Sequence, residues 1–218
     1  MTTSSGQLCT RPGLVFVPGA SGATRFRAAV RAAVAAVPAA PMLSEHVREA
    51  YESGLRLMRE HPDTELLGSG VPDPSIAEGG VAHVFVTTAE AWLREPVLAR
   101  EVFGPAALVV RVGDPAQLAT IAERLEGQLA ATVHAAPPDG ERARSLLPTL
   151  AEKAGRIIVN GWPTGVEVGT ATVHGGPFPA TSDGSSTSVG TLAIHRFLRP
   201  VAYQNLPPDL LYGIDTLG

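Results

Sequence analysis

Apolar and polar positions follow two different periods along the first 160 residues of the chain. The expected strands are short apolar runs, at 14–17, 81–87, 107–112, 129–134 and 156–160. The expected helices carry apolar residues at helical spacing, over 26–37, 45–61, 89–93, 115–126 and 141–154. Ser44 is a good N-cap for the second helix, and Pro148 is expected to bend or interrupt the last one. This alternation predicts an α/β fold with a mostly parallel sheet and flanking helices.

The remaining segments lack such periods. Residues 68–80 are rich in glycine and proline and are expected to form a loop. Residues 161–190 have neither a helical nor a strand period, and a structureless stretch of this length in a compact chain is usually a functional loop. Residues 191–203 then predict a last extended or mixed segment, broken at Pro200.

Composition narrows the class of protein. Charged residues make up 17% of the 218 residues, against about 25% in a typical globular domain, so a sizeable core is expected. The net charge of −4 and the lack of a basic run argue against nucleic acid as a partner. A single cysteine excludes an internal disulfide and a multi-thiolate zinc site. With no apolar run long enough for a membrane span and no signal-peptide core, the chain is expected to be soluble and cytoplasmic.

Cys9 is the first candidate for chemistry. It lies in a glycine-flanked turn that leads into the strand expected at 14–17, where an exposed thiol could act as a nucleophile. The alternative is that Cys9 is a small core residue, because free cysteine is often buried. The histidines show no metal-ligand spacing, so no metal is expected. His83 and His134 lie within apolar runs and are expected to be structural.

A glycine loop after the first strand offers a second candidate. Gly19-Ala20-Ser21-Gly22 is similar to the phosphate loop of short-chain dinucleotide-binding reductases. The third glycine of that motif is absent, and no acidic residue follows at the distance that would hold a ribose. A tight turn between a strand and a helix is therefore the preferred interpretation.

Three separate segments, in order and approximate spacing, resemble the aldehyde dehydrogenase superfamily. They are Gly6-Gln7-Leu8-Cys9-Thr10, Glu101-Val102-Phe103-Gly104-Pro105 and Gly155-Arg156-Ile157-Ile158-Val159-Asn160-Gly161. The first corresponds to the nucleophile motif of that superfamily and the second to a specific signature of it. The tail, at 175–182 and 195–205, looks like the branch of 2-oxoglutarate semialdehyde (2,5-dioxovalerate) dehydrogenases and NADP-dependent long-chain aldehyde dehydrogenases. The resemblance covers essentially residues 5–212.

This resemblance implies a reaction and a role for particular residues. In the superfamily a cysteine thiolate attacks the aldehyde, hydride passes to a nicotinamide, and the resulting thioester is hydrolysed. By this resemblance Cys9 is the nucleophile, Glu101 accepts hydrogen bonds from the nicotinamide ribose, and Phe103 packs against the nicotinamide. Without it, Glu101 would be a solvated carboxylate and Phe103 a core aromatic. The substrate-binding candidates are Trp162, Thr164 and Val166, in the aldehyde-lining loop, and Arg11, which could pair with a substrate carboxylate or be simply solvated.

The resemblance also implies what the chain lacks. Full-length members are more than twice as long, and their N-terminal half supplies the cofactor domain and the glutamate that activates water. We therefore expect a truncated chain that uses NADP or NAD, with a catalytic domain over 1–190 and a final strand for oligomer or interdomain contacts within 191–218. An aldehyde and further copies of the chain are the expected partners. The alternative is a non-catalytic remnant or assembly subunit that is inactive alone.

Overall fold

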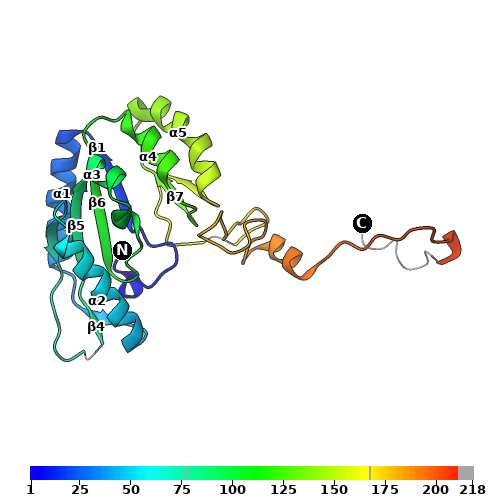
Figure 1. Ribbon diagram of the computed structural model, residues 1–218, viewed down its shortest axis with the longest axis horizontal. Coiled ribbons are helices and arrows are strands. Elements are labelled where there is room, and N and C mark those ends of the chain that lie inside the picture. The colour runs from blue at the N-terminus through cyan, green and yellow to red at the C-terminus, as the bar shows by residue number, and fades with distance from the viewer. Residues whose placement is uncertain (77, 167, 211–218) are drawn as a thin grey trace.

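A computed structural model describes residues 1–76, 78–166 and 168–210 of the chain (Figure 1). Its centre is a four-stranded sheet in the order β1-β6-β5-β3. The strands of this sheet are β1 (Leu14–Pro18), β3 (Glu65–Ser69), β5 (His83–Thr88) and β6 (Ala106–Val112). β1, β6 and β5 are mutually parallel, whereas β3 pairs with β5 in the antiparallel direction at the edge.

Helices cover both faces of this sheet (Figure 1). They are α1 (Ala20–Ala35), α2 (Glu45–Glu60), α3 (Ala89–Arg94) and α4 (Gln117–Arg124). Because side chains alternate along a strand, Val84 and Val86 pack with Val34 of α1 on one face. Phe85 and its neighbour Leu108 pack on the other face in a larger cluster with α2, α3 and α4. Burial on both faces explains why these strands are almost wholly apolar.

A smaller layer is formed by residues 131–159. β7 (Ala131–Val133) and β8 (Ile157–Val159) form a separate parallel pair, joined through η3 (Pro137–Asp139) and α5 (Gly140–Lys153). α5 packs against α4, so this layer rests on the main domain through helices. The remaining short elements are η1 (Thr3–Gly6), β2 (Ala40–Pro41), β4 (Gly79–Gly80), η2 (Pro96–Ala99), η4 (Thr191–Phe197) and η5 (Pro208–Leu210), of which β2 and β4 pair with each other.

The α/β class and the mostly parallel sheet are confirmed, and most of the expected elements form within two or three residues of the expected positions. The Ser44 side chain accepts a hydrogen bond from the Val47 N–H at 3.3 Å, as an N-cap does. Gly19, at φ 79°, forms the turn between β1 and α1. Helix α5 continues through Pro148 without interruption.

Two expectations about the loops and the tail are wrong. β4 and the last two residues of β3 lie within 68–80, the segment expected to be a loop. In the described part of the tail, η4 is a 3₁₀ helix and 198–207 pair with no strand, because an extended segment needs a partner edge to form a ladder. Figure 1 shows this tail running away from the body of the molecule.

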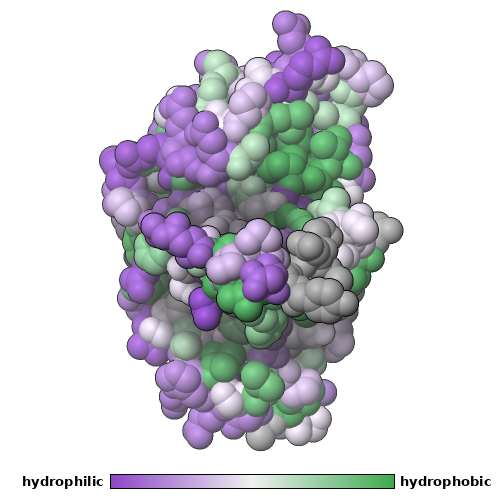
Figure 2. All heavy atoms as spheres, turned by 90° about the vertical axis from the view of Figure 1, so that its right-hand side faces the viewer, coloured by the Kyte–Doolittle hydropathy of each residue, from purple (hydrophilic) through white to green (hydrophobic). Residues whose placement is uncertain are grey.

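No helix among the residues that the structure describes is long and apolar enough to cross a membrane. The tail itself exposes several large apolar side chains, including Phe197, Leu198, Val201 and Tyr203. Figure 2 looks onto the face from which the tail projects and shows apolar atoms gathered into a patch on its upper part.

Candidate active site

The turn that carries Cys9 follows a short segment of left-handed backbone. Ser4, Ser5 and Gly6 of η1 have φ values of 52°, 52° and 67°, a conformation that costs energy for the two serines. The side chain of Gln7 then secures the turn, because its Oε1 accepts a hydrogen bond from the Leu43 N–H at 2.7 Å. The result is an exposed thiol on a fixed backbone.

The thiol of Cys9 faces an imidazole from the far end of the sequence. Its Sγ lies 3.3 Å from Nε2 of His174, which is within hydrogen-bonding distance for sulfur. The two residues are 165 positions apart. A thiol beside an imidazole is the arrangement that activates a cysteine nucleophile, since the imidazole can take the thiol proton.

His174 is held in place through its own main chain. Its N–H donates to Oγ1 of Thr187 at 2.8 Å, and its carbonyl accepts from both the N–H and the hydroxyl of Ser188 at 3.0 Å. Next to it, the main chain of Gly175 lies so close to Gly155 that a Cβ on Gly155 would overlap it. Only glycine permits this contact. The loop that carries His174 therefore lies directly on the main chain that leads into β8.

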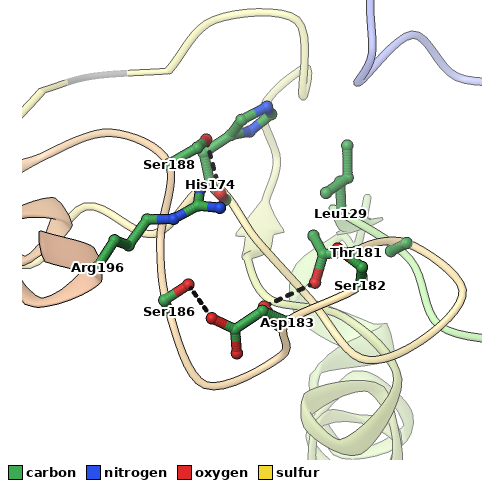
Figure 3. A pocket seen from close by; sticks show the side chains of 9 residues that line it. Leu129, His174, Thr181, Ser182, Asp183, Ser186, Ser188 and Arg196 are labelled. Atoms are coloured by element: carbon green, nitrogen blue, oxygen red, sulfur yellow. Dashed lines mark hydrogen bonds between the residues drawn. The ribbon is translucent and has the colours of Figure 1, made fainter.

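A pocket of about 210 Å³ opens beside His174 (Figure 3), lined by polar side chains together with Leu129 and Ala180. Arg196 points into it from η4, and Asp183 lies on the opposite side. Hydrogen bonds from Ser185 and Ser186 lower the pKa of Asp183 to about 2, so this carboxylate is ionised at neutral pH. The pocket is therefore lined by one positive and one negative side chain together with part of His174.

Arg11, two residues after Cys9, lies inside the protein. Its guanidinium donates to the carbonyl of Ala106 at 2.7 Å and to that of Val102. Nη2 also lies 3.8 Å from a carboxylate oxygen of Glu101. Burial lowers the pKa of Arg11, while Glu101 and Tyr51 act in the opposite direction. The expected alternatives, solvation or pairing with a substrate, both require exposure, whereas only 3% of this side chain is exposed.

Glu101 and Phe103 precede β6 on an irregular segment beside the Cys9 turn. The carboxylate side chain of Glu101 is 66% exposed and Phe103 is 38% exposed, so both are accessible to a ligand. Gly104 follows at φ 142°, and a Cβ there would overlap the ring of Tyr51. A Cβ on Gly6 would likewise overlap the main chain of Gly104. The nucleophile turn and this segment are thus in direct contact.

The expected substrate loop follows β8. Trp162 is 66% exposed, and its ring centroid lies 5.0 Å from that of His134. Thr164 and Val166 are half-buried. The side chain of Arg156 holds this loop, because it donates hydrogen bonds to the carbonyls of Gly165 and Pro163 at 2.7 and 2.5 Å.

The two histidines expected to be structural have different environments. His83 is buried, with Nε2 2.8 Å from Nη2 of Arg59 and Nδ1 2.8 Å from the Val81 carbonyl. His134 is exposed, because β7 ends one residue before it.

Two residues of the site were not predicted from the sequence. His174 and Thr187 lie in the aperiodic loop, and no local spacing distinguishes them from the other polar residues there. The available signal was the pair of glycines directly after His174, which suggests close packing of main chain.

No protein-family model matches the chain. Among curated proteins, it is 47% identical over 211 residues to alpha-ketoglutaric semialdehyde dehydrogenase 2 of Azospirillum brasilense. It is 43% identical over 212 residues to alpha-ketoglutaric semialdehyde dehydrogenase of Acinetobacter baylyi. These matches cover 97% and 94% of this chain but 40% of each relative, so the chain spans about two fifths of their length.

Solved structures show the same fold. The Delta-pyrroline-5-carboxylate dehydrogenase of Mycobacterium tuberculosis bound with NAD matches with a TM-score of 0.72 and 18% identity, over 96% of this chain and 40% of that one. The succinic semialdehyde dehydrogenase of Streptococcus pyogenes in complex with NADP+ matches with a TM-score of 0.71 and 18% identity, over 92% of this chain and 44% of that one.

Proposed function

Because the chain belongs to the aldehyde dehydrogenase superfamily, we propose that it carries the nucleophile-bearing part of an NAD(P)-dependent aldehyde dehydrogenase. The observation that carries this proposal is the 3.3 Å contact between Sγ of Cys9 and Nε2 of His174. The names of the two most similar relatives reported above support a 2-oxo semialdehyde, an aldehyde with a distal carboxylate, as the substrate.

In the proposed reaction Cys9 is the nucleophile and His174 its proton acceptor. Sγ forms a bond to the aldehyde carbon while the thiol proton moves to Nε2, and the carbonyl electron pair moves to oxygen. The backbone N–H of Cys9 donates to this oxygen. Once a thioester has formed, His174 releases its first proton to solvent and accepts a proton from the attacking water. The C–S bond then breaks, and Nε2 returns that proton to the leaving sulfur, which regenerates the thiol. The pocket that His174 helps to line is the proposed source of that water.

Glu101 and Phe103 fit the part of a nicotinamide dinucleotide that must meet the thiohemiacetal. The exposed carboxylate of Glu101 can accept two hydrogen bonds from a ribose diol, and the exposed ring of Phe103 offers a flat apolar surface. When bound, the dinucleotide supplies the hydride acceptor that turns the thiohemiacetal into a thioester. Trp162, Thr164 and Val166 would line the path of the aldehyde.

The division at 190 and the use of the tail in assembly belong to the same proposal. Residues 198–207 make no strand pairing, and the tail exposes Leu198, Val201 and Tyr203. A segment without strand pairing that exposes apolar side chains suits addition to another copy or to the rest of a longer protein. Deleting 191–218 should then reduce the oligomeric state measured by light scattering.

The rival function is that of a remnant or assembly subunit. The observation that suits an assembly role is the row of exposed apolar side chains in the tail, among them Leu198, Val201 and Tyr203. Reduction of NADP or NAD by the purified chain with alpha-ketoglutaric semialdehyde, followed by absorbance, separates the two. Turnover would exclude the remnant.

Alkylation by iodoacetamide tests the Cys9–His174 pair without any cofactor. Mass spectrometry should find the adduct on Cys9, and His174→Asn should slow alkylation at neutral pH by at least about tenfold, since general-base assistance contributes roughly 10²–10⁴-fold in enzymes. His195→Asn removes an exposed histidine of η4 and is the matched control. Equal rates in wild type and His174→Asn would refute the proposed pair.

A further inference from the structure

Arg11 connects the two segments on which the proposed reaction depends. It belongs to the Cys9 turn, where its own N–H donates to the Leu8 carbonyl at 3.1 Å. Its side chain reaches across to the segment that carries Glu101 and Phe103. There it donates to the carbonyls of Val102 and Ala106, on either side of Gly104.

The two segments fit together only in this arrangement. A Cβ on Gly6 would overlap the main chain of Gly104 and Pro105, so the backbones touch without side chains between them. On the other side of the turn, Gly13 leaves space for Nη1 of Arg11, which lies 3.2 Å from the position of a Cβ there. With Gly6 on one side of the turn, Gly13 on the other and the buried guanidinium between them, the two segments form one packed unit.

We propose that Arg11 is a positioning residue that fixes the Cys9 turn against the Glu101–Phe103 segment, and thereby sets the direction of the thiol toward His174. This inference rests on the proposed function. It replaces contact with substrate by contact with main chain as the role of Arg11. Its carboxylate partner Glu101 is held 3.8 Å away, which leaves most of that side chain available to a ligand.

The chemistry of the side chain explains why arginine is needed. Val102 and Ala106 present two carbonyl oxygens to one guanidinium, and a planar fork can donate to both at once. A lysine ammonium at this depth would be a single point charge on a flexible stem. It could keep the charge beside Glu101 but could not span the two acceptors.

A double-mutant cycle on the 218-residue chain tests the proposal. The probe is iodoacetamide, and the variants are Arg11→Lys and His174→Asn, alone and together. In wild type, His174→Asn should slow alkylation at least about tenfold. In the Arg11→Lys background the same substitution should change the rate less than about twofold, because the thiol no longer faces the imidazole.

A merely structural role predicts a different result. Arg11 and His174 do not touch in the structure. If Arg11→Lys only lowered the global stability, His174→Asn would slow alkylation by the same factor in both backgrounds, provided that the rates are measured well below the unfolding midpoint. That outcome would overturn the positioning role. Arg94→Ala, which removes the ion pairs of Arg94 with Asp63 and Glu95 elsewhere on the surface, is the matched control.

Hydrogen exchange in wild type keeps the test independent of whether the variants fold. The N–H of Arg11 donates to Leu8 and that of Ala106 donates to Gly104, one in each segment. If the segments form one unit, these two amides should exchange with the same opening equilibrium, within about threefold. Opening equilibria of these two amides that differ by clearly more than threefold would overturn the proposal. Failure of His174→Asn to affect wild type would instead refute the proposed Cys9–His174 pair and leave this measurement to decide on Arg11.

Discussion

Replacing Thr187 with valine removes one oxygen atom from the support of His174 and little else. Thr187 is 5% exposed, and its Oγ1 both accepts from the His174 N–H and donates to the Val189 carbonyl, each at 2.8 Å. Valine has the same shape but cannot make either hydrogen bond. Leaving partly buried main-chain groups unpaired costs about 1–2 kcal/mol, toward the lower part of the usual range.

The cost should be concentrated at the amide of His174. A loss of about 1–2 kcal/mol from its protection corresponds to roughly 5–30-fold faster hydrogen exchange. Thr187→Ser is the matched control, because serine keeps the oxygen and loses a methyl group worth about 0.8 kcal/mol. Exchange of the His174 amide should therefore be fast in the valine variant and close to wild type in the serine variant.

Iodoacetamide labelling of Cys9 provides the functional measurement. If the oxygen of Thr187 aims the imidazole, alkylation should slow in Thr187→Val and be retained in Thr187→Ser. The thermal midpoint of Thr187→Val should fall by about 2–8 °C for a chain of this size, at about 2–4 °C per kcal/mol. Identical exchange of the His174 amide in the two variants would show that the oxygen does not support the loop.

Three further substitutions test other parts of the fold. Ser4→Gly should raise the free energy of unfolding in urea by about 0.5–1 kcal/mol, because φ is 52° there, and an unchanged or lower value would contradict the strain. Ser44→Ala should cost about 1 kcal/mol of helix α2 capping in the same assay. Burial lowers the pKa of His83 below the ordinary 6.5, so the unfolded chain binds more protons below about pH 6.5. Stability should therefore fall as pH drops below 6.5, and His83→Gln should flatten this slope in urea titrations.

The sequence predicted the parts of the fold in which local pattern and burial agree. β5 and β6 lie between two helical layers, so both alternating sets of side chains are apolar and the runs at 81–87 and 107–112 are easy to recognise. β3 was missed because it is an edge strand, interrupted by Gly68 at a register shift. Its stability comes from pairing with β5, and a residue pattern does not record that pairing.

Only part of the site could be predicted from the sequence. Cys9, Glu101 and Phe103 were found through motifs, since each motif is contiguous in the chain. His174 was not, because its contact with Cys9 spans 165 residues and depends on the path of an aperiodic loop. The burial of Arg11 was missed for a related reason. Its acceptors are main-chain carbonyls, and these have no signature in the sequence.

Both members of the proposed catalytic pair are thus aimed through backbone hydrogen bonds rather than through a packed side-chain core. Gln7 and Arg11 brace the turn that carries the thiol, and Thr187 braces the loop that carries the imidazole. Because each support acts on a main-chain N–H or carbonyl, the thiol stays exposed and the imidazole beside it is only half-buried. Variants that lose a supporting hydrogen bond should therefore behave differently from a variant that loses the imidazole. Loss of a support should weaken the response of Cys9 to His174 while the thiol stays accessible, whereas loss of the imidazole should slow the reaction in every background that keeps the supports.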